Sequence, residues 1–370
     1  MAESVSSSAP SSDSVPTIVL DRTPFSTEAL NGSRISTAIP DKMAGSKEAL
    51  VKRGAIGLVM CGLATLAACS GKSAEGAPHA SPSNVLAPSE APLSQGADLD
   101  GRIAYGGESD DGSQFFIGGF DGSAPERLPL GSDAGIGSAS PDGTRLSVGQ
   151  PNADGSLLIS GNIGTDGTGL RLFASPDATL SLACGVWSPD GRHLACEGWD
   201  DSDPRRDGVY IVRASDGSDP QRLTDHRDIP CDFSPDGTKI AFVRIGTDTA
   251  NGTLHEPKSH LMVMDVDGSG AHRLRDDPVG FACDWSPDGR SILTEFSGTL
   301  SLVTPDGAST PIPLEGYATR GVWSPDGSHI AFGMSVELDH FDVYVSTPEG
   351  SEVTQITSSP LLEEPTAWIP

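Results

Sequence analysis

The sequence predicts an all-β protein: a six-bladed β-propeller of four-stranded antiparallel blades, closed by its C-terminal strand and preceded by a disordered N-terminal region. The first observation behind this prediction is composition, because 44 glycines and 29 prolines suit many short strands joined by tight turns. The second is a repeat: the tetrapeptide Ser-Pro-Asp-Gly occurs five times, at Ser140, Ser188, Ser234, Ser286 and Ser324. The third is a chain end in phase with that repeat, since Trp368 lies 45 residues after Trp323.

Each repeat is expected to form one blade. In Ser-Pro-Asp-Gly, proline presets φ for a tight turn, aspartate bonds back to the backbone, and glycine takes the open last position. An alternating strand such as "TKIAFVR" follows the turn, and then come a third strand, a second turn and a fourth strand. Four antiparallel strands in about 45 residues are typical of a propeller blade. The residue before the turn is mostly aromatic: Trp187, Phe233, Trp285 and Trp323, with Ala139 in the remaining copy.

The second turn predicts the number of blades. It is an Asp-Gly or Glu-Gly turn that occurs six times, at Asp121, Asp166, Asp216, Asp267, Asp306 and Glu349. Blade 1 begins at "GRIAYGG" (101–107) with no Ser-Pro-Asp-Gly turn before it, so it lacks an innermost strand there. The segment "PTAWIP" (365–370), which contains Trp368, is predicted to supply that strand. Such pairing would close the ring and remove an open sheet edge.

These motifs resemble the TolB-like, PD40-type subgroup of WD40-like β-propellers. The resemblance covers residues 100–370 and implies the fold, but it does not imply a particular function. One feature of the subgroup is absent, because TolB carries an α/β domain ahead of its propeller and nothing between Cys69 and Asp98 could form one. A role in a Tol–Pal system is therefore not expected from the sequence.

The N-terminal part divides into three segments ahead of a propeller at 99–370. Residues 1–42 are rich in Ser, Thr, Ala and Pro and are expected to be disordered. Residues 43–69 read as a signal peptide: basic residues precede an apolar run that is too short to span a bilayer comfortably. Residues 70–98 are expected to be a flexible tether.

The signal ends in Leu-Ala-Ala-Cys69, which resembles the lipobox of bacterial lipoproteins. The resemblance implies cleavage before Cys69, acylation of this residue, and an extracytoplasmic protein anchored to the bacterial membrane. An ordinary cleaved signal with a chance cysteine is the alternative. Met43 is a candidate initiator, because signals usually begin a chain; a short cytoplasmic tail on an uncleaved anchor is the other possibility.

The charge excludes some partners. The formal net charge is −27, and a surface this acidic repels phosphate backbones and anionic headgroups. No nucleic acid is therefore expected as a partner. No G-x-S-x-G, H-E-x-x-H or P-loop motif occurs, and no metal, cofactor or catalytic residue is predicted.

The longer loops, which join strands two and three and successive blades, share one face of the predicted ring, and ligand binding is expected there around the channel mouth. The candidates are Asp232 and Asp284, Trp199, Tyr317 and Arg320. The two aspartates begin adjacent inner strands and could offer carboxylates to a cation, or could each cap their own turn. Trp199 could stack on a sugar, anchor a partner or fold over a blade edge, and Tyr317 and Arg320 share this ambiguity.

Two functions remain open on the sequence alone. One is a non-catalytic propeller that binds an envelope protein or a small ligand. The other is a propeller enzyme, of lyase or lactonase type, with a metal or acid/base site at the channel mouth. Three or more metal ligands converging on the channel would favour the enzyme.

Four cysteines lie outside the signal, where oxidising conditions permit disulfides. Cys184 and Cys196 flank one Ser-Pro-Asp-Gly turn and would face each other across two strands if the hairpin holds a bulge. A bond between Cys231 and Cys283 would have to cross between blades and is less favoured. The alternative is that all four are small buried side chains.

Overall fold

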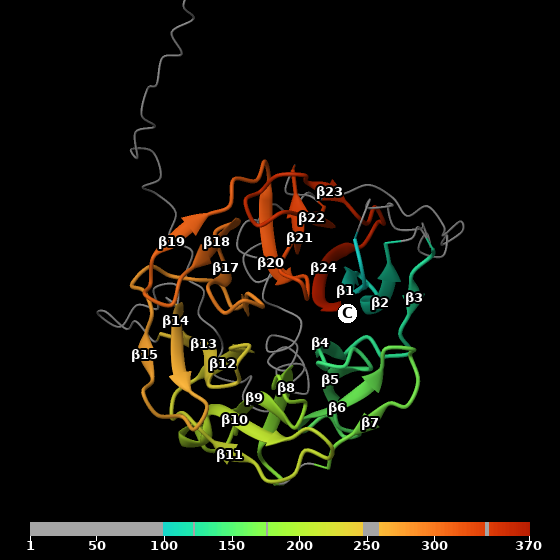
Figure 1. Ribbon diagram of the computed structural model, residues 1–370. Coiled ribbons are helices and arrows are strands. Elements are labelled where there is room, and N and C mark those ends of the chain that lie inside the picture. The colour runs from blue at the N-terminus through green and yellow to red at the C-terminus, as the bar shows by residue number, and fades with distance from the viewer. Residues whose placement is uncertain (1–98, 121–122, 175–176, 247–258, 337–339) are drawn as a thin grey trace, which may run out of the picture. The chain divides into compact units, whose positions relative to one another are not determined.

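The computed structural model describes residues 99–120, 123–174, 177–246, 259–336 and 340–370, which form a ring of six four-stranded antiparallel sheets (Figure 1). This confirms the predicted six-bladed propeller. The expectations for residues 1–98, including Cys69, lie outside the described residues. Within the described ranges, no helix is long and apolar enough to cross a membrane.

Each blade runs from an inner strand at the ring centre to a short outer strand. Blade 1 contains β24 (Leu362–Ile369), β1 (Arg102–Ser109), β2 (Gly112–Gly119) and β3 (Glu126–Arg127). Blade 2 contains β4 (Gly135–Ala139), β5 (Arg145–Pro151), β6 (Leu158–Gly164) and β7 (Arg171–Leu172). Blade 3 contains β8 (Ser181–Trp187), β9 (His193–Trp199), β10 (Gly208–Arg213) and β11 (Gln221–Arg222), with the 3-10 turn η2 (Pro204–Arg206) between β9 and β10.

The remaining blades repeat this order. Blade 4 contains β12 (Asp228–Phe233), β13 (Lys239–Ile245), β14 (Ser259–Asp265) and β15 (His272–Arg273). Blade 5 contains β16 (Cys283–Trp285), β17 (Ile292–Phe296), β18 (Thr299–Val303) and β19 (Ser309–Pro311). Blade 6 contains β20 (Tyr317–Trp323), β21 (Ile330–Ser335), β22 (Asp342–Ser346) and β23 (Thr354–Gln355).

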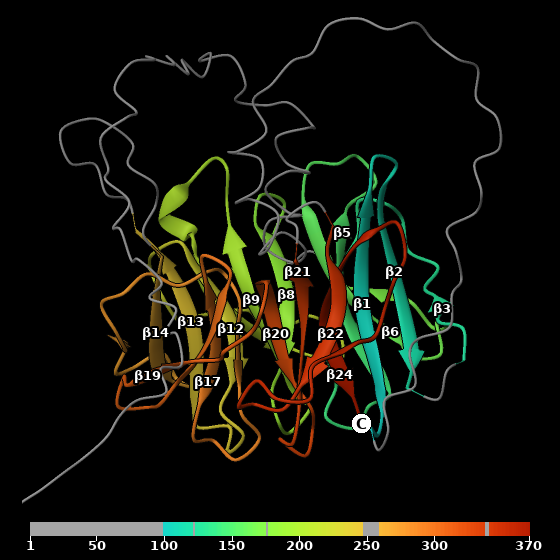
Figure 2. The same cartoon turned by 90° about the horizontal axis from the view of Figure 1, so that it is seen from above.

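The closing strand lies where the sequence places it. Strand β24 pairs antiparallel with β1, and Trp368 stands opposite Ile103. The Trp368 side chain is buried, its Nε1–H donates to the Asp100 carbonyl at 2.9 Å, and its ring lies 5.0 Å from that of Phe120. The two views in Figures 1 and 2 show β24 and β1 side by side in the ring. The predicted closure is therefore confirmed.

The five Ser-Pro-Asp-Gly turns share one geometry. In the first of them, the Gly143 N–H donates to the Ser140 carbonyl at 2.8 Å, and the Ser140 hydroxyl donates to Asp142 Oδ1 at 2.6 Å. Gly143 has a φ of 66°, in the left-handed region that glycine adopts without steric cost. The same two hydrogen bonds recur in all copies, with positive φ at Gly191, Gly237, Gly289 and Gly327. Local sequence alone therefore specifies these turns.

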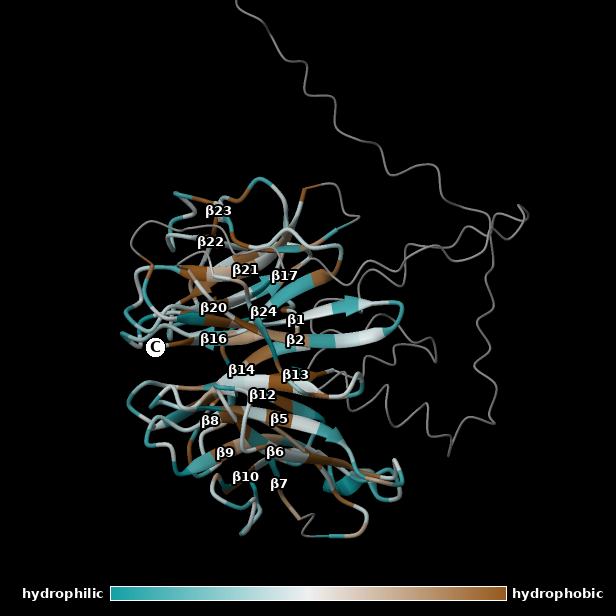
Figure 3. Ribbon diagram, turned by 90° about the vertical axis from the view of Figure 1, so that its right-hand side faces the viewer, coloured by the Kyte–Doolittle hydropathy of each residue, from teal (hydrophilic) through white to brown (hydrophobic). Residues whose placement is uncertain are grey.

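The core lies between the blades. Hydrophobic residues concentrate in the strands, and hydrophilic residues in the turns and loops (Figure 3). One cluster joins Trp368 and Tyr105 of blade 1 to Val343 of blade 6, and another joins blades 3 and 4. Each sheet thus buries both faces against its neighbours. The aromatic residues of the repeat are all at most 9% exposed: Trp187, Phe233, Trp285, Trp323 and Trp368.

Candidate functional site

The inner strands of all six blades line a small cavity in the central channel. Its volume is about 90 Å³. A water molecule takes about 30 Å³ of liquid volume, and pockets for organic ligands are usually about 300 Å³ or more. The cavity can therefore hold a few waters or one small group, so a larger ligand would have to bind at a mouth of the channel. Every blade contributes the residue at one equivalent position of its inner strand: Gly137, Gly185, Cys231, Cys283, Gly321 and Thr366.

β-Bulges on several of these inner strands contribute residues to the cavity lining. The pairing register shifts between Cys184 and Val186 in β8, and between Pro230 and Asp232 in β12. A third shift, between Thr319 and Gly321, occurs in β20. Each bulge adds one unpaired residue to the inner strand and bends it. These extra residues, Gly185, Cys231 and Arg320, all line the cavity.

Asp232 and Asp284 line the same cavity and fasten neighbouring blades together. Asp232 accepts the Phe233 N–H at 2.8 Å and, through its other oxygen, the Trp285 N–H of blade 5 at 2.8 Å. Asp284 accepts the Trp323 N–H of blade 6 at 2.6 Å. Ser138 occupies the equivalent position in blade 2, and its hydroxyl accepts the Trp187 N–H of blade 3 at 3.1 Å. A polar residue at this position therefore links one inner strand to the next.

The two aspartates interact as a pair. Burial raises the pKa of Asp284 to about 6. Burial, followed by the charge of Asp284, raises the pKa of Asp232 well above its ordinary value. The charge of one carboxylate disfavours ionisation of the other, because like charges in a buried site repel each other.

Neither sequence hypothesis for these aspartates includes the contacts between blades. Three of their oxygens accept backbone N–H groups, two of these from the next blade. The two aspartates do not cap their own Ser-Pro-Asp-Gly turns, because the aspartate within each turn does so. Among the described residues, no group of three or more His, Cys, Asp or Glu side chains is placed to hold a metal ion.

Among the described residues that line the cavity, Arg320 is the one basic side chain. It is half-buried and has a φ of 33°, which is unusual for a residue with a side chain. Its charge lowers the pKa of Asp284 and of Glu364 against the effect of burial. The salt bridges found within the described ranges do not include Arg320. Its guanidinium therefore offers hydrogen-bond donors at the channel.

Further carboxylates gather at the loop-bearing face beside Arg320. Glu364, near the start of β24, accepts the Thr319 hydroxyl at 2.7 Å, and burial raises its pKa. Burial also raises the pKa of Glu295, at the end of β17, to about 7, with a smaller contribution from the charge of Glu364. Glu108, at the end of β1, has a pKa raised by burial as well. The sequence analysis missed these residues, although Glu364 lies on the same side of β24 as the channel residue Thr366.

The aromatic candidates are less accessible than expected. Trp199 is 7% exposed and packs against Leu158 and Ala183 between blades 2 and 3. It therefore presents no open ring to a sugar or a partner, and its position corresponds to the third option, packing over a blade edge. Tyr317 is half-buried, with its ring edge-on to Phe341 at 6.2 Å.

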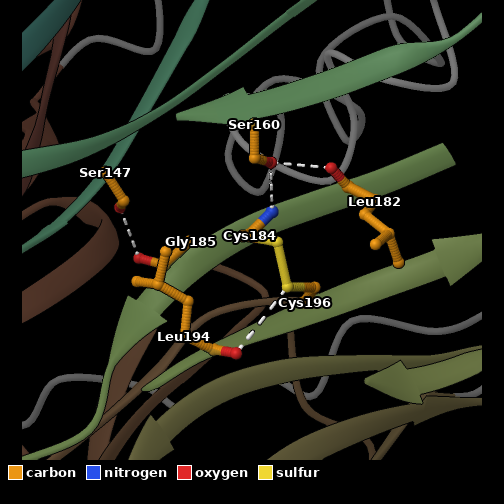
Figure 4. Close-up of a disulfide and its surroundings, with 7 residues drawn as sticks. All are labelled: Ser147, Ser160, Leu182, Cys184, Gly185, Leu194 and Cys196. Carbon is orange, nitrogen blue, oxygen red and sulfur yellow. Dashed lines mark hydrogen bonds between the residues drawn. A yellow bond between two sulfur atoms is a disulfide. The ribbon is translucent and has the colours of Figure 1, made fainter. Parts of the chain in front are cut away.

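A disulfide joins Cys184 and Cys196, which face each other on β8 and β9 with a Cα separation of 3.8 Å (Figure 4). Blade 2 holds this strand from the other side. The Cys184 N–H donates to the Ser160 hydroxyl at 2.7 Å, and Ser160 donates to the Leu182 carbonyl at 2.6 Å. Blades 2 and 3 are therefore linked by side-chain hydrogen bonds at the disulfide.

A second disulfide joins Cys231 of β12 to Cys283 of β16, with a Cα separation of 5.2 Å. The sequence analysis disfavours this bond because it crosses between blades. The bulge in β12 explains the difference. Cys231 is the extra residue, and it turns toward the channel, where Cys283 occupies the equivalent position of the next blade.

Comparison with known proteins agrees with this fold. A segment of 137 residues is 34% identical to the Tol-Pal system protein TolB of Anaeromyxobacter dehalogenans, strain 2CP-C, and covers 35% of this chain and 29% of that protein. TolB of Anaeromyxobacter sp. strain K matches over the same length with the same identity. The crystal structure of TolB from Acinetobacter baumannii superposes with a TM-score of 0.58 at 18% identity, over 74% of this chain and 68% of that one. This chain carries a TolB-like β-propeller.

No family model matches the chain. The matched segment spans under a third of the curated relatives' length, 29%, so it says nothing about the rest of those proteins. The functional argument therefore rests on the geometry of this propeller. Its features are a narrow channel, a pair of aspartates that links blades, and Arg320 beside several carboxylates at the loop-bearing mouth.

Proposed function

We propose that this chain is an exported lipoprotein, anchored to the bacterial membrane through Cys69, whose propeller binds a partner protein of the cell envelope and does not catalyse a reaction. Two observations support this proposal. The curated relatives are named as proteins of the Tol-Pal system, and the segment ending at Cys69 has the layout of a lipoprotein signal.

The partner is proposed to dock on the loop-bearing face around the channel mouth. The observation that carries this proposal is Arg320, a channel-lining arginine at a bulge with positive φ. Unusual backbone conformations persist where the surrounding structure imposes them, and they cluster at binding sites. Arginine presents several donors in a fixed geometry that suits a carboxylate or a pair of carbonyl oxygens.

The size of the channel supports a protein partner over a small organic ligand. A cavity of about 90 Å³ is too small for such a ligand, whereas a protein can cover the mouth and insert one group. A carboxylate or carbonyl group of the partner would meet Arg320. Basic groups of the partner, near that carboxylate or carbonyl, would interact with Glu108, Glu295 and Glu364, which lie at the same face.

Site-specific photo-crosslinking in the native envelope tests the docking face. Val336 is 69% exposed beside the loop after β21, and Val266 is 38% exposed in the turn after β14, on the opposite face. A photoreactive residue at position 336 should capture a discrete partner, and the same residue at 266 should not. Arg320→Gln should reduce the crosslinking yield at position 336 by about tenfold, because the complex would lose one charge-assisted hydrogen bond.

Equal yields from the two positions, or a yield at 336 that Arg320→Gln leaves unchanged, would contradict docking at this mouth. The anchor is tested separately by cell fractionation. Cys69→Ala should move the protein from the membrane fraction to the soluble extracytoplasmic fraction, and a variant that stays on the membrane would contradict acylation at Cys69.

A further inference from the structure

We propose a second binding site in the groove between blades 2 and 3, on the face that carries the Ser-Pro-Asp-Gly turns, and we infer that it binds a carboxylate attached to an apolar group. The groove has a volume of about 460 Å³, within the usual range for ligand pockets of about 300–1,000 Å³. It lies between the sheet of β4–β7 and the sheet of β8–β11, which are neighbours in Figure 1. This inference goes beyond the proposed function, which concerns the opposite face.

Two arginines stand on the blade 2 wall of this groove. Arg145 begins β5 and Arg171 begins β7, and both line the groove. Asn162 of β6 lies between them: it pairs with Arg171 across the sheet, and its Oδ1 accepts a hydrogen bond from Arg145 Nη1 at 2.6 Å. Side chains at paired positions share one face of a sheet. Both guanidinium groups therefore lie on the face of blade 2 that is turned toward blade 3.

These arginines lack the carboxylate partner that blade 4 provides at the equivalent position. In blade 4, Lys239 stands opposite Asp265 and forms a salt bridge with it at 2.8 Å. In blade 2, Arg145 takes the position of Lys239, but the residue opposite is Gly164. The hydrogen-bond partner of Arg145 is a neutral amide, and neither arginine takes part in the salt bridges found within the described ranges. The site therefore presents two positive charges without a salt-bridge partner, beside the turn carboxylates Asp142 and Asp190 that also line it.

The acidic residues in the groove have structural roles. Asp142 accepts the Ser140 hydroxyl at 2.6 Å and the Thr144 hydroxyl at 2.8 Å, and these bonds lower its pKa. Asp190 accepts the Ser188 hydroxyl at 2.6 Å in the equivalent turn, with the same effect on its pKa. Asp216 of the nearby second turn is held by Ser218, and the charge of Arg171 is the smallest cause of its lowered pKa. These acids recur in the turns of the repeat, so the two arginines are what distinguishes this groove.

The groove also has apolar lining residues. Trp187, Pro141, Pro189 and Ala214 line it together with the two arginines. A ligand that places its carboxylate at Arg145 and Arg171 can therefore pack an aliphatic or aromatic group against these residues. A peptide ending in an apolar residue has this chemistry, and so does a small free carboxylate with an apolar tail.

Calorimetric titration of the full chain with paired probes tests the inference. N-acetyl-leucine carries the carboxylate and the apolar group, and N-acetyl-leucinamide differs from it only by lacking the charge. The acid should bind saturably and the amide should not. Arg145→Gln and Arg171→Gln should each raise the Kd for the acid by about tenfold or more, as expected for loss of a charge-assisted contact.

Lys239→Gln is the matched control, because it removes a cation at the same repeat position in blade 4, and it should leave the Kd unchanged. Both arginine side chains are exposed, so the thermal midpoints of their variants should equal that of the parent protein. A pentapeptide ending in a free leucine distinguishes the two sources of carboxylate. Binding of the peptide at least tenfold tighter than N-acetyl-leucine supports a protein terminus, and equal affinity supports a small metabolite. Equal binding of acid and amide, no saturable binding of either acid, or affinity that survives both arginine substitutions would overturn the proposal.

Discussion

Burial controls the ionisation of single carboxyl groups in this propeller, and Glu197 is the simplest case. The side chain lies in β9 and is 7% exposed, and its Oε2 has no hydrogen-bond partner among the described residues. Burial raises the pKa of Glu197 to about 7, with Arg227 opposing the shift and Asp207 adding to it. The folded state therefore disfavours the charged form of this group.

Glu197→Gln should stabilise the protein at alkaline pH. The pKa of this carboxyl is higher in the folded state than in the unfolded state. Its contribution to the free energy of unfolding is therefore complete below the unfolded pKa, near 4.5, and is lost as the pH rises through the folded pKa of about 7. Glutamine has no such loss, so the variant should match the parent at pH 4.5 and exceed it at pH 8 by about 1–3 kcal/mol. Urea unfolding at both pH values measures this difference.

The exposed Glu126→Gln is the control, and it should change stability little at either pH. If Glu197→Gln lowers the free energy of unfolding equally at pH 4.5 and pH 8, the side chain acts through packing, and the account of its ionisation is wrong.

At the residue scale, the sequence predicted where the channel residues lie better than it predicted which groups they contact. It placed Asp232, Asp284 and Arg320 near the channel because the repeat aligns equivalent positions of successive blades. It could not predict that the aspartates accept N–H groups of the next blade, because that contact depends on the spacing of inner strands around the ring. The sequence left three options open for Trp199 and could not choose among them, because Leu158, which packs against it, lies 41 residues earlier in the chain.

At the element scale, the bulged inner strands carry the features that distinguish this propeller. The disulfide between Cys231 and Cys283 joins the bulged strand β12 to β16 across a sequence separation of 52 residues. The disulfide between Cys184 and Cys196 closes only 12 residues within one blade. A cross-link restricts the unfolded chain more when the loop that it closes is longer.

Replacing both Cys231 and Cys283 with serine should lower the free energy of unfolding by about 2–4 kcal/mol, and replacing Cys184 and Cys196 should lower it by less. Urea unfolding of the two double variants, with and without reductant, measures both effects. A stability of the Cys231/Cys283 double variant equal to that of the oxidised parent would show that the inter-blade bond does not contribute.

The Ser-Pro-Asp-Gly turns were fully predictable because every contact that defines them lies within six consecutive residues. A bulge in β8 was part of the sequence hypothesis for Cys184 and Cys196, whereas the bulge in β12 leaves no signature in the alternation of apolar residues. The disulfide between blades 4 and 5 was disfavoured because it crosses between blades, and the structure brings both cysteines together at the channel.

At the scale of the whole molecule, the ring is held by packing between neighbouring blades and is closed by β24. The sequence predicted the number of blades and the closure, since six second turns and one in-phase tryptophan leave a single arrangement. The closing strand also brings Glu364 and Thr366 to the channel beside Arg320. Closure therefore links the stability of the fold to the proposed binding mouth.

Deleting residues 365–370 from the full chain tests the central claim most directly. The deletion removes the pairing of Trp368 with Ile103 and its hydrogen bond to the Asp100 carbonyl, and it exposes the edge of β1. Burial of this tryptophan alone is worth about 3–5 kcal/mol, and about 1 kcal/mol shifts the thermal midpoint of a domain this size by about 2–4 °C. We expect the midpoint to fall by about 10 °C or more. An unchanged midpoint would contradict closure of the ring by the chain end.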